Sequence, residues 1–450
     1  MSSVLKGNIA NYLLKQSGIL LLGILLLASF MLIDVYFISQ LSGEALAAVS
    51  YATPVMTLLV SLLLGVGAGM VVVVSNAAGQ QDAALLWKLT VSCLSFALLI
   101  ALLLWLLVSL GGEALFYQLG ARGEVLSLLM EYFDAITLGL SLLSMLIAVT
   151  SIARALGNHK LLTVSMLLLV VINAVLDPLL IFGLWGFPQM GISGAAWATV
   201  IAIFISLWVP VPYLLKEFSR LPYLELRLKD YFQWRSITAL ALPIALTNVL
   251  VPLGNTLFVR MLSTFGDSAV AAYGAGSRVD MLVILSFTSL TAVMAPFIGQ
   301  NLGAHKYERA YESFRLSVFY ALGLGIVAAG LITYFSSEIS AIFTTDTATL
   351  KALQRYLMIM PWGYAMNGYL MISITTLNVY QKPWLATALA MCQLFLFFLP
   401  IAYGATLWDN YLFVLSAYPL SHILAAFVSC RILEKMLTEK SVSLHLSGKG

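Results

Sequence analysis

The chain of 450 residues is 61% apolar and only 10% charged, with a net charge of +3. Soluble proteins carry about 25% charged residues, and an apolar surface of this size would not stay in solution. The composition therefore excludes a soluble enzyme, a nucleic-acid-binding protein and a disordered scaffold. Since about 20 apolar residues cross a bilayer as a helix, we expect an all-α polytopic membrane protein.

Twelve apolar segments follow one another along the sequence and predict twelve transmembrane helices. They comprise residues 13–40, 45–76, 88–110, 124–151, 161–184, 191–215, 237–263, 280–300, 313–335, 349–377, 384–405 and 410–432. The first segment is too long for the apolar core of a signal peptide, so we expect it to remain as a transmembrane helix.

The longest polar stretch, at 216–235, separates six predicted helices from another six. It predicts two lobes that are joined by a cytoplasmic linker and followed by a cytoplasmic tail. The predicted boundaries are 1–215 for the N-terminal lobe, 216–236 for the linker, 237–433 for the C-terminal lobe and 434–450 for the tail.

The positive charges indicate the orientation in the membrane. With the N-terminus in the cytoplasm, eighteen of the 23 Lys and Arg residues fall on the cytoplasmic side. The exceptions are Arg122, Arg260, Arg278, Lys351 and Arg355. Because cytoplasmic loops carry an excess of Lys and Arg, this distribution predicts that both termini are cytoplasmic and that the number of spans is even.

The two groups of six helices repeat each other weakly. A shift of 224 residues places 75–79 on 299–303, and Tyr132 on Tyr356. Because each repeat contains an even number of helices, both enter the membrane from the same side, and the pseudo-twofold axis is expected along the membrane normal. Transporters built from such parallel repeats bind substrate between the halves and rock one half against the other.

Charged residues are rare within the predicted spans, and a charge in a span is by default a candidate for function. The candidate cation-coupling site consists of Asp34, Tyr132, Asn173, Asp177 and Thr199. At 1.5 Å per residue, Asp177 lies about 25 Å from the cytoplasmic start of its span, while Tyr132 and Thr199 lie about 12 Å from the outer ends of theirs. All five can therefore meet in the outer half of the bundle. The alternative is that Asp34 and Asp177 are structural, hydrogen-bonded polar groups.

The second half shows no matching set of acids. The repeat places Asn255 opposite Asp34 and Ile401 opposite Asp177, and Asp280 falls at the end of the predicted eighth span. If ion coupling uses carboxylates, the sequence confines it to the N-terminal half.

Methionine and aromatic side chains in the spans suit a pocket that accepts varied apolar cargo, although such residues also pack helices or face lipid. The candidate residues of a substrate cavity are Met31, Tyr36, Met166, Asn255 and Phe287.

Several motifs are absent from the sequence. No G-x-x-x-x-G-K-[ST] loop for ATP occurs, the four histidines form no metal-binding set, and no nucleophile–base pair stands out. We therefore expect a protein that is not an enzyme, that holds no cofactor or metal, and that takes its energy from an ion gradient.

The pattern resembles the multidrug and toxic compound extrusion (MATE) family of transporters over nearly the whole chain. The motifs that carry the resemblance are Asp34-Val-Tyr-Phe, Arg154-Ala-Leu-Gly-Asn, Asn173-x-x-x-Asp177-Pro178 and Gln300-Asn301-Leu302-Gly303-Ala304. The N-terminal polar residues resemble those of its prokaryotic, DNA-damage-inducible (DinF-like) branch. Two features depart from relatives: the C-terminal acids of the sodium-dependent branch are missing, and no proline precedes Asp34 in the first span.

The resemblance implies a bacterial inner-membrane antiporter, acting as a monomer, that exports amphipathic and often cationic drugs by alternating access in exchange for protons. Its partners would be small-molecule drugs and the lipid bilayer, and no nucleic acid. Two alternatives remain open at this point. Sodium could replace the proton at the same carboxylates, or the chain could be a lipid-linked oligosaccharide flippase of the same superfamily.

Overall fold

The computed structural model describes the backbone of residues 2–219 and 233–447, and the side chains of these residues except 2–3, 29–32 and 437–447. Nearly all of the described residues are helical, and no strand occurs among them. The predicted all-α fold is confirmed.

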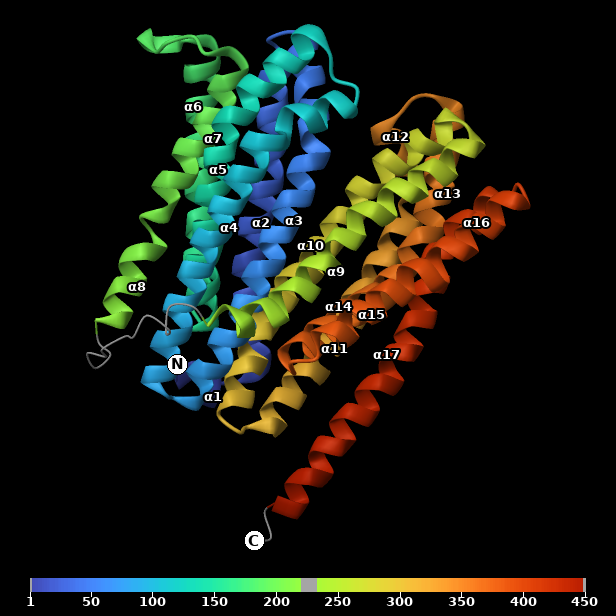
Figure 1. The fold of residues 1–450 in the computed structure, drawn as a ribbon. Helices are drawn as coiled ribbons and strands as arrows, with labels where there is room; N and C mark the ends of the chain where they lie inside the picture. Colours follow the sequence, from blue (N-terminus) through green and yellow to red (C-terminus); the bar gives the residue numbers. More distant parts are fainter. Residues whose placement is uncertain (1, 220–232, 448–450) are drawn as a thin grey trace. The chain divides into compact units, whose positions relative to one another are not determined.

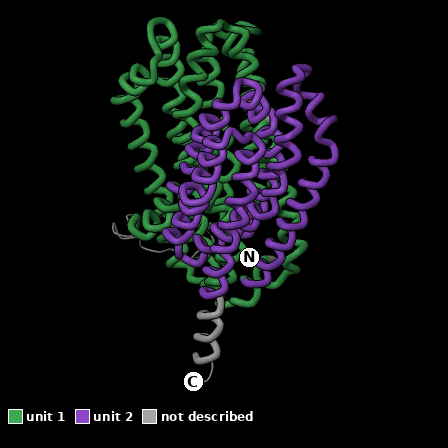
Figure 2. The backbone as a smooth tube through the Cα atoms, turned by 90° about the vertical axis from the view of Figure 1, so that its right-hand side faces the viewer, with its two compact units in different colours: residues 1–245, 295–310 green, residues 246–294, 311–450 purple. Residues whose placement is uncertain are grey.

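The chain divides into two compact units (Figure 2). Unit 1 comprises residues 1–245 and 295–310, and unit 2 comprises 246–294 and 311–450. Residues 295–310 thus group with the first half of the sequence. The predicted linker lies mostly at 220–232, outside the described residues, and the predicted lobe and tail boundaries stay predictions.

Unit 1 is built around long helices that lie side by side (Figure 1). Helix α5 packs against α3, α4 and α7, while α6 packs against α2 and α7. The helices are α1 (Ser2–Lys6), α2 (Ile9–Ser39), α3 (Gly43–Gln80), α4 (Ala83–Gln118), α5 (Gly123–Ala155), α6 (Lys160–Phe182), α7 (Gly191–Leu207) and α8 (Pro210–Phe218). A short 3-10 turn, η1 (Leu184–Gly186), joins α6 to α7.

Local sequence signals set the starts and the close contacts of these helices. Ser42 and Asp82 cap α3 and α4, because their side-chain oxygens accept backbone N–H groups at 3.0 Å. Gly65 in α3 has no side chain, so the backbones approach closely: a Cβ there would lie 2.3 Å from the Cα of Ala245. Small residues at such crossings let transmembrane helices pack tightly.

Unit 2 contains the helices of the second half of the sequence. Helices α9 (Trp234–Leu262), α10 (Asp267–Gly303) and α11 (Tyr307–Tyr334) run through both units. A 3-10 turn, η3 (Ser263–Phe265), precedes α10. The remaining elements are α12 (Ser336–Phe343), α13 (Thr347–Ile359), η4 (Met360–Gly363), α14 (Tyr364–Val379), α15 (Pro383–Met391), the π-helix η5 (Cys392–Phe398), α16 (Leu399–Leu407) and α17 (Tyr411–Ser447).

Eleven helices within the described residues are long and apolar enough to cross a membrane. The predicted tenth span, 349–377, is broken into α13, η4 and α14, and neither helical piece reaches 18 residues. Pro361 lies at the break, where its ring removes a backbone N–H and disfavours a helical residue before it. With this broken span included, the described residues are consistent with the twelve predicted transmembrane helices.

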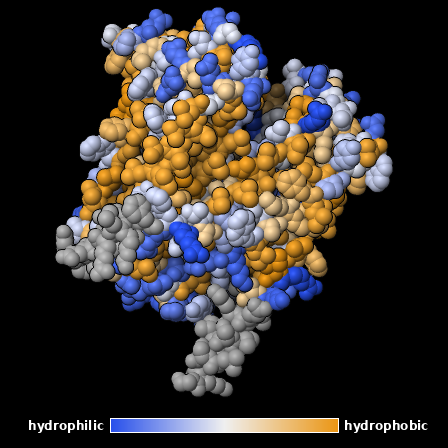
Figure 3. Space-filling view, viewed as in Figure 1, coloured by the Kyte–Doolittle hydropathy of each residue, from blue (hydrophilic) through white to orange (hydrophobic). Residues whose placement is uncertain are grey.

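The surface fits a bilayer. On the face drawn in Figure 3, apolar side chains cover the middle of the helices and hydrophilic side chains gather toward their ends. Exposed apolar residues include Leu98, Leu102 and Leu110 of α4 in unit 1 and Phe319 and Ile326 of α11 in unit 2. Exposed apolar side chains are favourable in contact with lipid tails and unfavourable in contact with water.

Candidate functional site

The five polar residues predicted to couple a cation all lie in unit 1, on neighbouring helices. Asp34 is on α2, Tyr132 on α5, Asn173 and Asp177 on α6, and Thr199 on α7. The Asn173 Nδ2 donates a hydrogen bond of 3.0 Å to the Thr199 Oγ1. This bond joins α6 to α7 at the level of the site.

The carboxylates are close enough to act on each other. Asp34 lies within electrostatic range of both Asp177 and Tyr132. Asn173 and Asp177 are fully buried, Tyr132 is buried, and Asp34 is partly buried. The structure therefore brings the five predicted residues into one cluster, with α6 between α2 and α7.

Four polar oxygens of this cluster lack partners among the described residues. Both carboxylate oxygens of Asp177, the Oδ1 of Asp34 and the Oδ1 of Asn173 are buried and accept no hydrogen bond. Taking a carboxylate out of water without a donor or a cation is costly. A bound proton or small cation would offset that cost, so the arrangement suits reversible cation binding.

The predicted substrate-cavity residues do not form one cluster. Tyr36 is exposed on α2 and Met166 is half-buried on α6 beside Gly23, both in unit 1. In unit 2, Asn255 is exposed on α9. Phe287 is only 1% exposed and lies inside unit 2, where it packs against Gly368 of α14.

The placement of Phe287 favours helix packing over contact with cargo. The side chain of Met31 lies outside the described residues. The cavity assignments of the five residues stay predictions.

Asp280 of α10 forms a second buried polar site, in unit 2. It was expected at the end of a span, but α10 begins at Asp267, so Asp280 lies about 20 Å along the helix at 1.5 Å per residue. The expectation was wrong because the polar residues of 267–279 made the predicted span start too late. The second half therefore does carry an acid within a span.

Two tyrosines hold the Asp280 carboxylate. The hydroxyl of Tyr356 donates to its Oδ2, and the hydroxyl of Tyr364 donates to its Oδ1. Tyr356 lies in the last turn of α13 and Tyr364 is the first residue of α14, so the carboxylate bridges both sides of the broken span. Gly276 makes room for this contact, because a Cβ there would lie 2.3 Å from the Tyr356 ring.

A signal for this second cluster was present in the sequence. The repeat shift places Tyr356 on Tyr132, the tyrosine of the first cluster. What the shift does not show is that Tyr356 meets an acid from α10, since no acid in α3 occupies the corresponding place.

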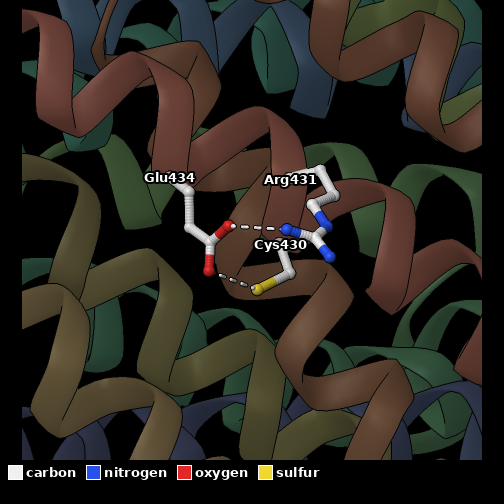
Figure 4. Close-up of polar contacts among 3 residues, drawn as sticks. All are labelled: Cys430, Arg431 and Glu434. Atoms are coloured by element: carbon white, nitrogen blue, oxygen red, sulfur yellow. Dashed lines mark hydrogen bonds and ion pairs between the residues drawn. The ribbon is translucent and has the colours of Figure 1, made fainter.

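Polar contacts at residues 430–434 of α17 are of a different kind (Figure 4). Arg431 and Glu434 form an exposed ion pair of 3.7 Å, and the Cys430 Sγ lies 3.6 Å from the Glu434 carboxylate. Exposed pairs of this kind contribute little to stability. No group of three or more metal-ligating side chains occurs in the described part of the chain.

Among the described residues, eleven long apolar helices, a broken twelfth span and a buried polar cluster within the helices are typical of a membrane transporter. The family model described as MatE matches residues 20–179 and 243–404. The chain belongs to the multidrug and toxic compound extrusion (MATE) family.

Relatives cover nearly the whole chain. A Shewanella oneidensis protein named FAD transporter is 32% identical over 437 residues, or 97% of this chain and 96% of the relative. The Bacillus subtilis probable multidrug resistance protein YoeA is 27% identical over 393 residues, covering 86% of this chain and 82% of the relative. The crystal structure of the Vibrio cholerae MATE transporter VcmN in the bent form is 25% identical, with a TM-score of 0.88 and coverage of 98% of this chain and 99% of that one.

Proposed function

We propose that this transporter exports amphipathic, often cationic organic compounds in exchange for protons, by alternating access. The observation that supports this is the shared site of Asp34 and Asp177, in which three buried carboxylate oxygens accept no hydrogen bond. Proton binding lowers the free energy of such a buried carboxylate, because protonation removes a buried charge.

The cluster links proton binding to helix position. Protonation from the outer side turns a carboxylate into a hydrogen-bond donor. The Oδ1 of Asn173, which has no partner, can accept a hydrogen bond from it. Helix α2 then shifts relative to α6, and cargo leaves outward. Loss of the proton toward the cytoplasm restores the charged state and resets the transporter.

The test is drug export by the purified protein in liposomes, with and without a pH gradient. Asp34→Asn should abolish gradient-driven export while the protein still folds. Asp134→Asn is the matched control, because Asp134 is exposed on α5 and should leave export unchanged. Full gradient-driven export by Asp34→Asn would overturn the proposal.

Sodium is the rival coupling ion at the same carboxylates. The same unpartnered oxygens support sodium binding, because hard cations take carboxylate and amide oxygens as ligands. Export that persists after the pH gradient is collapsed and follows an imposed sodium gradient would favour sodium.

The cargo has a second candidate class. The relative that is 32% identical over 97% of this chain is named FAD transporter, which favours a flavin dinucleotide as cargo. FAD carries an anionic pyrophosphate, so this candidate differs in charge from the cationic drugs. Uptake of radiolabelled FAD and of an ethidium-like cation into the same liposomes distinguishes the two classes.

We further propose that the chain lies in the bacterial inner membrane as a monomer, with both termini in the cytoplasm, and belongs to the DinF-like branch. The excess of Lys and Arg on one side supports the orientation. Labelling of terminal tags in intact cells and in inverted vesicles checks it, and mass photometry of the purified protein checks the oligomeric state.

A further inference from the structure

The N-terminal residues of unit 1 accept hydrogen bonds from two cationic side chains, one in the turn between α10 and α11 and one in the first turn of α11. The Lys306 Nζ donates to the carbonyl of Leu5 at 2.9 Å. Arg309 donates to the carbonyls of Gly7 at 2.8 Å and Val4 at 3.2 Å. These are hydrogen bonds from charged donors, the stronger kind, and they satisfy carbonyls at the end of α1.

A second set of contacts holds the same turn against the loop between α5 and α6. The Gln300 Nε2 donates to the carbonyl of Ala155 at 2.6 Å. The Tyr12 hydroxyl lies 3.1 Å from the His159 Nε2, and the Tyr12 ring packs 5.3 Å from the Phe297 ring, centroid to centroid. The N-terminal segment therefore lies on a surface made by two loops that are far apart in the sequence.

Backbone contact completes the arrangement. A Cβ on Gly299 would lie 2.0 Å from the Ser75 Oγ, and a Cβ on Gly303 would lie 2.1 Å from the Asn76 carbonyl oxygen. The end of α10 thus packs directly on the end of α3, without intervening side chains. Contact this close leaves no room for water or cargo between the two helix ends.

The contacted turn lies between α10 and α11, both of which continue into unit 2. Its side of the membrane is the predicted cytoplasmic side, where Lys6, Lys306 and Arg309 lie. Within alternating access, cargo from the cytoplasm needs the helix ends on that side to separate. The hydrogen bonds of Lys306 and Arg309 go to backbone carbonyls, not to acids, and water can replace them when the contact opens.

We propose that residues 2–7 form a strap that fastens residues 295–310 to the rest of unit 1 and must release before the transporter opens to the cytoplasm. This proposal rests on the alternating access of the proposed function. The strap sets how often the cytoplasmic side opens, whereas the Asp34–Asp177 cluster sets which ion drives the cycle.

Ser75 provides a reporter for this opening. A Ser75→Cys variant, in a background with Cys93, Cys392 and Cys430 replaced by Ala, places one thiol at the buried contact with Gly299. A membrane-impermeant maleimide is added to inverted vesicles, and the labelling rate is measured. The same reporter is then combined with Lys306→Met and Arg309→Met, which keep side-chain bulk and remove the donors.

We expect the double variant to label at least about tenfold faster than the reporter alone, because the hydrogen bonds that hold the closed contact are lost. A factor of ten corresponds to about 1.4 kcal/mol. Deletion of residues 2–7 should give a similar increase. Arg315→Met is the matched control, because Arg315 is exposed on α11 and makes none of these hydrogen bonds. An unchanged labelling rate in a double variant that elutes as a folded protein would overturn the strap.

The outcome is separable from that of the proposed function. The labelling rate needs no ion gradient and is repeated with Asp34→Asn present. A faster rate in the strap variant, together with export that ignores the pH gradient, supports the strap and overturns proton coupling. The reverse pattern overturns the strap alone.

Discussion

The two units treat their intramembrane carboxylates in opposite ways. In unit 2, each oxygen of Asp280 accepts a hydrogen bond from a tyrosine hydroxyl. In unit 1, Asp177 accepts none, and the Oδ1 of Asp34 is equally without a partner. Both sites include a tyrosine, and the repeat relates the two, Tyr132 and Tyr356. Only Tyr356 donates a hydrogen bond to the acid of its site.

This difference separates a structural acid from an acid available for cation binding. Two donors stabilise the ionised form of Asp280, which then holds the broken span α13–η4–α14 together. An acid without donors carries a charge that its surroundings do not stabilise, so it gains from a proton or a metal ion. The following predictions test that distinction, from the largest expected effect to the smallest.

Asp177→Asn should reduce gradient-driven export to the level of empty liposomes. The substitution replaces one oxygen of the proposed cation-binding carboxylate, and neither of these oxygens accepts a hydrogen bond, so the thermal unfolding temperature should be unchanged or higher. Export assays and thermal unfolding in detergent measure the two effects. A large loss of stability would show that Asp177 has a structural role like that of Asp280.

Asp280→Asn should have the reverse profile. One oxygen becomes an amide that cannot accept from a tyrosine, and we expect a loss of about 2 kcal/mol, the cost of one hydrogen bond to a charged group. Export should keep its dependence on the pH gradient. Denaturant unfolding in mixed micelles gives the stability, and export that no longer responds to the gradient would contradict the division of roles.

Tyr364→Phe sharpens the comparison by removing a single donor and keeping the acid. We expect a loss of about 1.5–3 kcal/mol, with the broken span more accessible to hydrogen exchange around η4. Tyr36→Phe is the control, because that hydroxyl lies on an exposed side chain of α2. Equal stability of the two variants would show that Tyr364 does not hold Asp280 in place.

Thr199→Val removes the acceptor of the Asn173 amide in unit 1 while keeping the shape of the side chain. The expected cost is about 1 kcal/mol, that of a neutral hydrogen bond. Ion selectivity should change more than stability, because Asn173 becomes free to turn toward Asp177. Export under proton and sodium gradients, compared with wild type, measures the change.

His159 lies outside the spans and predicts a pH dependence of stability that is separate from the two intramembrane sites. Burial, together with the charge of Arg154, lowers the pKa of His159 to about 3. The unfolded chain, with a His pKa of about 6.5, binds a proton that the folded protein does not. Stability should therefore fall by about 1 kcal/mol between pH 7 and pH 5.5.

His159→Gln should remove that pH dependence of stability. The measurement is thermal unfolding of both proteins across this pH range. A slope that survives the substitution would have to come from another group.

The sequence predicted the number of spans and the membership of the first cluster. Hydropathy was enough for the spans, and depth along each helix was enough to place Asp34, Tyr132 and Asp177 at one level. The break at Pro361 escaped the hydropathy pattern because apolar residues continue on both sides of it, from Leu357 to Met366. Asp280 was misplaced because polar residues precede it in α10, and its tyrosine donors come from a span that appeared continuous.

The strap contacts could not be predicted either. Lys306 and Arg309 served in the sequence only as markers of orientation, since their acceptors are backbone carbonyls that no pattern of side chains reveals. The partners lie about 300 residues away in the chain, and only the three-dimensional packing of unit 1 brings them together.

The π-helix η5 places a limit on the internal symmetry of the chain. Its i→i+5 hydrogen bonds widen the turn and alter the angular spacing of the side chains. Helix α6 contains Asn173 and Asp177 in an unbroken α-helical phase, whereas its repeat partner passes through seven residues of π-helix. Residues that the repeat shift of 224 places on each other therefore point in different directions. A copy of the proposed cation site cannot be built in unit 2 by placing Asn and Asp at positions 397 and 401, because the helical phase would have to be restored first.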